Sequence, residues 1–395
     1  MSHFVYADNA ATTRMSEAAF DAMLPWLREH YGNPSAVYRI GREAKRALDA
    51  AREQIATSIG AKKSEEIFFT GGGTEADNWA IRGIAERDAK KGRHIITSMI
   101  EHHAVSHTLE ALEKQGFEIT YLPVDKLGRL SPHVLRAAIR EDTILVTIML
   151  ANNEIGTIQP IDQLGGIARA RGVPFHVDAV QAVGHIPVDV EAMRIDMLSL
   201  SAHKFRGPKG IGALYVRKGI TLPSFLTGGG QEGGKRAGTE NVAASVGMAA
   251  ALCEAVRDLA ENQARISALR DKLISGLCQI PFVRLTGDPE NRLPGIASFV
   301  VECIEGEAAL LMLDREGICA SSGSACSSGA LDPSHVLLAT GHPHEIAHGS
   351  VRFSFGEEST EADVDYILEK FPPIIEKLRA MSPLWEEKMH EPPGD

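Results

Sequence analysis

Short apolar runs alternate with amphipathic segments between about residue 50 and residue 216. Seven of the runs are expected to be strands: Ile67–Thr70, Ile95–Ser98, Glu118–Leu122, Ile144–Met149, Phe175–Asp178, Met197–Ser201 and Gly212–Val216. Segments of helical character lie between most of them, as at 103–115, 131–140 and 161–171. This alternation predicts an α/β fold built on a mostly parallel, doubly wound sheet of seven strands.

The pattern becomes looser in the last third of the chain. The elements expected there are a long helix at 241–279, a strand at Ile296–Cys303, a helix at 306–316, a strand at Ser350–Phe355 and a helix from about 360. We expect a large domain over residues 15–260 and a smaller α+β domain made of residues 1–14 and 261–395. The tail at 383–395 is expected to be frayed.

Residues that could bind a ligand or take part in a reaction follow several of the predicted strands. The glycines at 71–73, the pair Glu101-His102, Asp178 and Lys204 each come after a strand end. In sheets of this kind, ligands bind beyond the carboxyl ends of the strands. We therefore expect these groups to converge on one edge of the sheet.

Lys204 and Asp178 have the residue types that a pyridoxal 5′-phosphate site requires. Lys204 follows a strand and enters a turn rich in Gly and Pro, and Asp178 ends another predicted strand. A lysine can form a Schiff base with the cofactor aldehyde, and an acid can pair with the pyridinium nitrogen. Taken alone, Lys204 would be interpreted as a surface lysine beside a loop.

The segment Thr70-Gly71-Gly72-Gly73-Thr74 follows a strand and opens a helix. Glycines let main-chain N–H groups approach an anion, and a helix N-terminus favours negative charge. The segment predicts a phosphate site, although a plain turn is the alternative. Thr74 is expected to cap the helix, with Asp77 completing a capping box.

Three further motifs offer polar groups. His102 or His103, of which only one is expected to face the site, could stack on a flat cofactor and move protons, or could cap a helix. Asn153 follows a strand and could bond a carboxylate, although a turn is the simpler interpretation. Arg352 interrupts an apolar strand, so its charge should meet either a substrate carboxylate or an internal acid.

Cys326 is the one cysteine in a small, polar segment, which runs from Ala320 to Gly329. An exposed thiol on such a loop can reach a substrate. The alternative is an ordinary Ser/Gly loop that includes a cysteine. The other four cysteines lie in apolar or amphipathic runs and are expected to be buried and inert.

Composition excludes several classes of protein. The net charge of −11 argues against a surface for nucleic acid, which requires basic patches. No apolar run approaches the ~20 residues of a membrane span, and the N-terminus lacks the features of a signal peptide. The five scattered cysteines form no CxxC pair, which argues against a disulfide framework and a zinc site. We expect a cytoplasmic protein without direct contacts to nucleic acid or membrane, and no resident metal.

Taken together, the motifs resemble those of cysteine desulfurases of the NifS/IscS type, which belong to the class-V aminotransferases and to the fold-type-I pyridoxal phosphate enzymes. The resemblance runs from Tyr6-Ala7-Asp8-Asn9-Ala10-Ala11-Thr12-Thr13 to Arg352. Its most specific parts are Ser201-Ala202-His203-Lys204, the Cys326 loop, and Gly228-Gly229-Gly230-Gln231-Glu232 with Arg236-Ala237-Gly238-Thr239-Glu240-Asn241. Tyr38 and Gly233 depart from the pattern, where the family often has His and Arg.

The resemblance implies a role for each matching position. Lys204, Cys326 and His102 would be catalytic. The cofactor would be held by Gly73, Thr74, His102, Asn153, Asp178, Gln181, Ser201, His203 and Lys204, and by Thr239 from a partner subunit. Asp178 would meet the ring nitrogen and Gln181 the ring hydroxyl. Asn33, Asn153 and Arg352 would hold the substrate carboxylate.

The reaction that the resemblance implies is conversion of L-cysteine to L-alanine, with the sulfur left on Cys326 as a persulfide. The protein would be a homodimer, and its sulfur would pass to an iron–sulfur scaffold, for which Cys326 could serve as a transient cluster ligand, or to a tRNA-thiolating protein. Two alternatives remain open. One is a selenocysteine lyase or another pyridoxal phosphate lyase or aminotransferase of the same fold, and the other is a catalytically silent binding partner.

Overall fold

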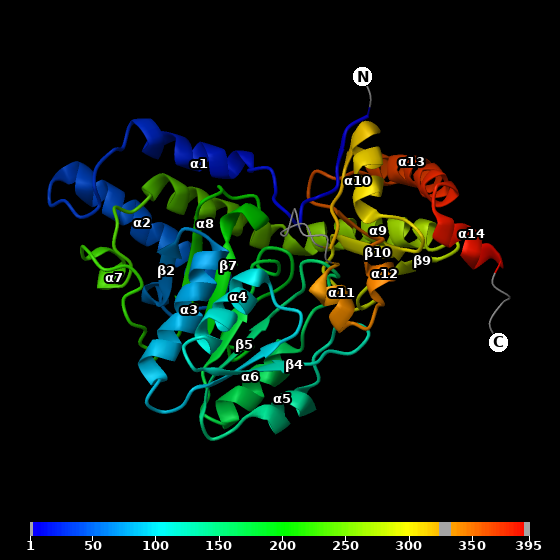
Figure 1. Ribbon diagram of the computed structural model, residues 1–395. Coiled ribbons are helices and arrows are strands. Elements are labelled where there is room, and N and C mark those ends of the chain that lie inside the picture. The colour runs from blue at the N-terminus through cyan, green and yellow to red at the C-terminus, as the bar shows by residue number, and fades with distance from the viewer. Residues whose placement is uncertain (1–2, 324–332, 391–395) are drawn as a thin grey trace.

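The computed structural model describes residues 3–323 and 333–390 (Figure 1). Its largest sheet has seven strands in the order β2-β8-β7-β6-β5-β3-β4. They are β2 (Ile67–Thr70), β3 (His94–Ser98), β4 (Glu118–Leu122), β5 (Thr143–Met149), β6 (Phe175–Asp178), β7 (Met197–Ser201) and β8 (Gly212–Val216). β8 runs antiparallel to both of its neighbours, and the other pairs are parallel. The predicted mostly parallel sheet of seven strands is confirmed.

Helices cover both faces of this sheet because successive strand residues point to opposite sides. On one face lie α3 (Gly73–Asp88) and α4 (His103–Glu113), whose apolar residues share a cluster with Ile95. The neighbouring Ile96 belongs to the cluster on the other face. That cluster includes residues of α2 (Arg39–Ser58), α5 (Pro132–Ala138), α6 (Ile161–Ala170) and α8 (Val242–Arg257). The sheet is thus doubly wound, as predicted.

A second hydrophobic core surrounds Phe299, Phe353 and Phe371. Its main sheet has the order β12-β10-β9, and β1 pairs with β11 in a small two-stranded sheet. The elements here are β1 (Val5–Tyr6), α9 (Leu259–Leu277), β9 (Val283–Leu285), β10 (Ile296–Val301), α10 (Gly306–Arg315), β11 (Ile318–Cys319), β12 (Ser350–Ser354) and α13 (Glu361–Ala380). We propose that this core is the smaller domain of residues 1–14 and 261–395, and that residues 15–260 form the larger one.

The remaining elements are short or lie at the edges of the molecule. They are α1 (Glu17–Arg28), η1 (Ser64–Glu66), η2 (Ala202–Lys204), α7 (Gln231–Gly234), α11 (His335–Ala339), α12 (His344–Ala347) and α14 (Pro383–His390). Figure 1 shows α1, α2 and α7 at one end of the molecule and α13 and α14 at the other. In the part of the chain described, each helix is too short or too polar to span a lipid bilayer.

Two predictions about helices are wrong. The segment 241–279 is two helices, because Asp258 leaves the helical conformation with φ −97° and ψ 7° and separates α8 from α9. The tail is not frayed from residue 383, because α14 covers Pro383–His390 and packs on the smaller core. Trp385 lies edge-on to Phe282, and the guanidinium of Arg379 lies 4.4 Å from the centre of the Trp385 ring.

The N-terminal segment crosses from the smaller core to the large sheet. The N–H of Asn9 donates to the carbonyl of Ser354 in β12 at 3.1 Å, and the N–H of Thr13 donates to the carbonyl of His203 at 3.0 Å. The residues between these two contacts therefore lie against the carboxyl ends of the central strands.

Candidate active site

A cavity of about 510 Å³ opens at the carboxyl edge of the large sheet. This volume is in the range of small-molecule and cofactor sites. The predicted residues that line it are Gly73, Thr74, His102, Asn153, Asp178, Gln181, Ser201, His203, Lys204 and Arg352. The strand-end argument thus predicted the place where these side chains meet.

Lys204 is held at the cavity wall by the N-terminal segment. Its Nζ donates hydrogen bonds to the main-chain carbonyls of Ala10 at 2.6 Å and Ala11 at 2.9 Å. The ring Nε2 of His185 lies 2.9 Å from the main-chain carbonyl of Lys204, and this contact holds the turn that carries the lysine. The amine is therefore oriented by main-chain groups from a distant part of the chain.

Asp178 occupies the last position of β6, next to β7, which leads to Lys204. Burial raises the pKa of its carboxyl group, and the N–H of Val180 and the charge of Lys204 oppose that rise. The N–H of Val180 donates to Oδ1 of Asp178 at 2.9 Å. An acid and a lysine at the ends of neighbouring strands share one cavity, as the sequence predicted.

The glycine-rich turn brings the N-terminus of α3 to the cavity. Gly72 is the N-cap residue with φ 151°, and no side chain caps the helix. The predicted cap at Thr74 is therefore wrong, because Thr74 already lies within the first turn. A Cβ atom at Gly73 would lie 2.5 Å from Cγ2 of Val180, so this position requires glycine. The first N–H groups of a helix lack partners within it and favour an anion.

Both histidines after β3 line the cavity, so the prediction that only one of them faces it is wrong. His102 is also the N-cap of α4, because its Nδ1 accepts a hydrogen bond from the N–H of Ala104 at 3.1 Å. Burial, with a smaller contribution from the charge of Lys204, lowers the pKa of His102 to about 4. The His102 ring is therefore neutral near pH 7.

Arg352 projects from β12 and is 2% exposed. Its Nη1 donates to the carbonyl of Asn153 at 2.7 Å, and its Nη2 donates to Oδ1 of Asp8 at 3.0 Å. Its Nε is buried and has no hydrogen-bond partner among the described residues. The internal acid expected for this arginine is thus present, and the guanidinium also lines the cavity.

Asn33 and Thr239 do not join the cavity of their own chain among its described residues. Asn33 lies exposed between α1 and α2, where its Oδ1 accepts a hydrogen bond from the N–H of Ser35 at 2.9 Å. Asn33 thus lies apart from the cavity of its own chain, and its contact with substrate stays a prediction. Thr239 is likewise exposed, as a residue offered to a partner subunit requires.

Cys326 lies outside the described residues. Gly323 and Pro333, which flank the undescribed segment, both line the cavity. The other four cysteines are free thiols, and the expectation that they are buried is wrong: Cys253, Cys303 and Cys319 are partly exposed and Cys278 is exposed. For Cys278, Cys303 and Cys319 the reason is that each lies at, or within two residues of, the end of a helix or strand.

Three buried acids line the cavity, and of these only Glu101 was among the groups expected at this edge of the sheet. They are Asp77, Glu101 and Glu154. Burial raises the pKa of Glu101 to about 8 and that of Glu154 to about 7. Oδ1 of Asp77 and Oε2 of Glu101 are buried without a hydrogen-bond partner in the described chain. Asp77 and Glu154 were not predicted as site residues, and the one signal for them was a predicted site residue within four positions.

The fold and the site assign the chain to a known family. It belongs to the class-V aminotransferases, a family that matches residues 5–367. This family and its cysteine desulfurases are pyridoxal phosphate enzymes.

The similarity to individual proteins is close. The sequence is 55% identical over 380 residues to cysteine desulfurase IscS of Methanosarcina thermophila, covering 96% of this chain and 94% of that protein. The fold matches a solved NifS-like protein with a TM-score of 0.90 and 40% identity, covering 95% and 100% of the two chains. SspA, solved in complex with cysteine, matches with a TM-score of 0.80 and 37% identity over 90% and 100% of the two chains. The predicted resemblance to the NifS/IscS type is confirmed.

Proposed function

We propose that this chain is a cysteine desulfurase that converts L-cysteine to L-alanine with the help of pyridoxal 5′-phosphate. The observation that carries the proposal is the presence of Lys204 and Asp178 in one buried cavity at the ends of neighbouring strands. The relatives named cysteine desulfurase, which match nearly the whole chain, support the same conclusion.

The cavity suits pyridoxal 5′-phosphate in both size and polar groups. Lys204 offers an amine for the aldehyde, and the buried Asp178 offers a carboxyl group for the ring nitrogen. One carboxylate oxygen of Asp77 and one of Glu101 have no hydrogen-bond partner within the described chain, so polar atoms of the cavity wall are available to a bound group. Thr74, Ser201 and His203 would bind the phosphate together with the N-terminus of α3 at Gly73, Gln181 would contact the ring hydroxyl, and His102 would stack on the ring. When bound, the cofactor supplies an electron sink for charge that develops at the substrate α-carbon.

The side chains of the cavity bind the substrate and transfer protons. Arg352 and the Asn153 segment orient the substrate carboxylate through charge-assisted hydrogen bonds. Lys204 takes the proton from the α-carbon. The imidazole of His102, which burial keeps neutral near pH 7, moves a proton to or from the substrate sulfur.

Cys326 is the proposed acceptor of sulfur. Its thiolate attacks the substrate sulfur, so that a sulfur–sulfur bond forms and the carbon–sulfur bond breaks. The electron pair of the broken bond stays with the carbon fragment, which is protonated to give alanine. The position of Gly323 and Pro333 at the cavity supports this role. The persulfide then passes to an iron–sulfur scaffold or a tRNA-thiolating protein, a transfer that takes place in the cytoplasm.

We also propose that the protein is a homodimer. α1 exposes Phe20, Leu24 and Leu27 on one side, and Tyr31 and Val37 follow in the next loop with 80% and 86% exposure. An apolar surface of this kind marks a protein interface. A partner subunit would cover it and bring Thr239 to the phosphate site.

The proposal is tested by incubating the protein and its Lys204→Ala variant with L-cysteine, pyridoxal phosphate and a thiol reductant. Wild type should release alanine and sulfide in equal amounts, and Lys204→Ala should release neither while still binding cofactor through the phosphate and ring. Lys218→Ala, which changes a lysine outside the cavity, is the control. Release of selenide from selenocysteine without activity on cysteine would instead establish the lyase alternative, and a wild type inactive on both would establish a binding role.

A further inference from the structure

Arg292 is a buried arginine between the smaller core and the wall of the cavity. It is 4% exposed. Within the described residues, its three hydrogen bonds all go to main-chain carbonyls: Nη2 donates to Ile155 at 3.0 Å, Nε to Ile296 at 3.1 Å, and Nη1 to Asp288 at 3.2 Å. Burying a guanidinium group is costly because its charge loses water. The cost is offset where its N–H donors, fixed in one plane, bond to several acceptors at once.

Ile155 belongs to the turn of residues 152–157, which follows β5 and forms part of the cavity wall. The turn is closed internally, because Oδ1 of Asn152 accepts from the N–H groups of Glu154 at 2.8 Å and Ile155 at 3.0 Å. The N–H of Gly156 also donates to the carbonyl of Asn152 at 3.0 Å. The turn therefore behaves as a rigid unit whose position depends on what holds it from outside.

Two arginines of the segment 261–395 bond to this turn, beside main-chain hydrogen bonds such as the one from the N–H of Leu293 to the carbonyl of Gly156 at 2.8 Å. Arg352 bonds to the carbonyl of Asn153, and Arg292 bonds to the carbonyl of Ile155. The same Arg292 bonds to Ile296 at the start of β10, and β10 pairs with β12 so that Ser298 lies opposite Arg352. Arg292 thus links the turn to the sheet from which Arg352 projects.

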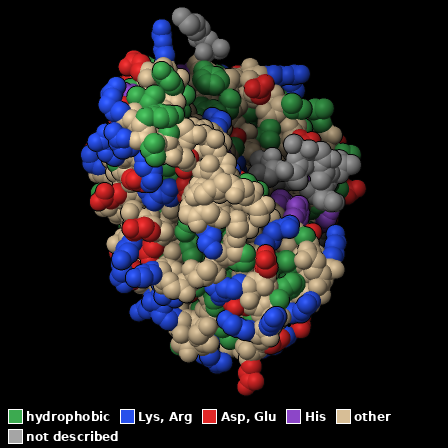
Figure 2. Space-filling view, turned by 90° about the vertical axis from the view of Figure 1, so that its left-hand side faces the viewer, with side chains coloured by type: hydrophobic (Ala, Val, Ile, Leu, Met, Phe, Trp, Pro, Cys, Tyr) green, Lys and Arg blue, Asp and Glu red, His purple; other side chains and the backbone are tan. Residues whose placement is uncertain are grey.

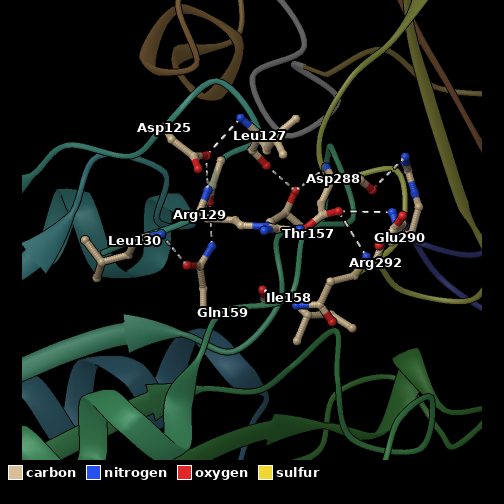
Figure 3. Close-up of polar contacts among 12 residues, drawn as sticks. Asp125, Leu127, Arg129, Leu130, Thr157, Ile158, Gln159, Asp288, Glu290 and Arg292 are labelled. Atoms are coloured by element: carbon tan, nitrogen blue, oxygen red, sulfur yellow. Dashed lines mark hydrogen bonds and ion pairs between the residues drawn. The ribbon is translucent and has the colours of Figure 1, made fainter. Parts of the chain in front are cut away.

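Neighbouring contacts make this link rigid (Figure 3). Arg129 forms an ion pair with Asp288, whose carboxylate is fully buried. Thr157, at the end of the turn, accepts a hydrogen bond from the N–H of Asp288 at 3.0 Å and donates to the carbonyl of Leu127 at 2.6 Å. The segment around Arg292 is therefore fixed on both sides, and these contacts together with the side chain of Arg292 set the position of the turn.

We infer that Arg292 is a positioning residue of the substrate site, which sets the distance between the 152–157 turn and the guanidinium of Arg352 and so determines how well the site binds a carboxylate. The inference rests on the proposed function, in which Arg352 binds the carboxylate of cysteine. It assigns to Arg292 no contact with substrate or cofactor.

The test compares two ligands of the cofactor-loaded enzyme, L-cysteine and cysteamine, which is cysteine without its carboxylate. Binding is followed by the change in absorbance of bound pyridoxal phosphate. Arg292→Lys keeps the charge but cannot reach three carbonyls. It should weaken the binding of cysteine about tenfold, as expected for the loss of one charge-assisted hydrogen bond, and change that of cysteamine less than twofold.

Arg270→Met is the matched control. Arg270 is also buried, at 6% exposure, and its Nη1 bonds to the carbonyl of Leu293 in the same segment at 3.0 Å. It has no hydrogen bond to the 152–157 turn among the described residues. Both variants should lose stability, but only Arg292→Lys should discriminate between the two ligands and speed hydrogen exchange of the amides at 152–157 in the cofactor-free protein.

A second reference separates failure of this inference from failure of the proposed function. Arg352→Met should show the same selective loss of cysteine. If Arg352→Met is selective and Arg292→Lys binds both ligands as wild type does, or weakens both equally, the positioning role is wrong. If Arg352→Met is not selective, Arg352 is not the carboxylate ligand and the inference falls together with that part of the proposed function.

Discussion

Asp8 and Arg352 form an ion pair at 3.0 Å across 344 positions of sequence. Arg352 lines the cavity, whereas Asp8 is not among the described residues that do. The Asp8 carboxylate accepts a hydrogen bond from one edge of the guanidinium, and the carbonyl of Asn153 accepts one from another edge. Because two of its edges are occupied by protein groups, the guanidinium is preorganised for an anion that arrives from the cavity. Figure 2 shows histidine side chains gathered on the right-hand side of the face that it presents.

Replacement of Asp8 by asparagine should weaken cysteine binding about fivefold to tenfold, because one charge-assisted hydrogen bond to Arg352 becomes a neutral one. The affinity for pyridoxal phosphate should stay the same. Titration with cysteine, followed by the absorbance of the bound cofactor, gives the result, and Glu358→Gln on an exposed carboxylate is the control. Tighter binding of cysteine would show that Asp8 competes with the substrate for Arg352.

Cys326→Ser should separate cofactor binding from sulfur transfer. The variant should bind pyridoxal phosphate and cysteine but should form no persulfide and release no alanine, because a hydroxyl group cannot carry the transferred sulfur. Mass spectrometry of the enzyme after incubation with cysteine measures the added sulfur. Cys278→Ser is an informative control because Cys278 is exposed. Sulfur found on Cys278 or Cys319 in the Cys326→Ser variant, with alanine still released, would contradict the assignment.

Glu101 should make the cofactor-free protein less stable as the pH rises. Burial raises the pKa of its carboxyl group from 4.5 to about 8, so between these values the folded state keeps a proton that the unfolded state releases. The free energy of unfolding therefore falls with rising pH across this window and levels off above it, by an amount on the order of 2–4 kcal/mol.

Glu101→Gln removes this titration, because a neutral amide replaces a neutral acid and can still accept from Ser98 and Met149. Urea unfolding at pH 5 and pH 8.5 should show a smaller loss of stability for the variant than for wild type. Glu53→Gln, at an exposed position of α2, is the control. An equal loss in wild type and Glu101→Gln would mean that Glu101 ionises normally in the folded protein.

The double variant Leu24→Glu and Leu27→Glu should convert the dimer to a monomer. These leucines are 50% and 62% exposed on α1, and two buried carboxylates in an apolar interface would be costly. Light scattering measures the mass, and the monomer should also lose pyridoxal phosphate faster because Thr239 of the partner is absent. Leu311→Glu alters an equally exposed leucine on α10, at 69%, and should leave the dimer intact. An unchanged mass in the double variant would place the interface elsewhere.

Local pattern was sufficient to predict the large sheet and the centre of the site. Buried parallel strands are short apolar runs, and their carboxyl ends meet at one edge, so the strand pattern alone places Asp178 and Lys204 together. The break at Asp258 could not be predicted in the same way, because neither Gly nor Pro marks it and the apolar positions continue on both sides.

The sequence pattern did not predict the ion-pair partner of Arg352 or the positions of Asp77 and Asn33, because these depend on contacts between segments that are distant in the sequence. The partner of Arg352 depends on the path of the N-terminal segment, which no local pattern records. Asp77 was interpreted as part of a helix cap, but it lies four positions after Gly73, the first residue of α3, and lines the cavity. Asn33 shares a sequence motif with site residues, yet the turn that carries it lies at the outer end of the molecule, between α1 and α2 in Figure 1.

The route of the N-terminal segment also sets the order of events during synthesis. Residues 8–11 are synthesised near the start of the chain, and Ser354, with which Asn9 and Ala10 form hydrogen bonds, is synthesised 344 positions after Ala10. Domains generally fold as units while the chain emerges, beginning at the N-terminus. In this protein the N-terminal residues that bond to Lys204 can take their final position only after β12 has been synthesised. A nascent chain that ends before Ser354 therefore lacks the residue to which Asn9 and Ala10 are hydrogen-bonded in the folded protein.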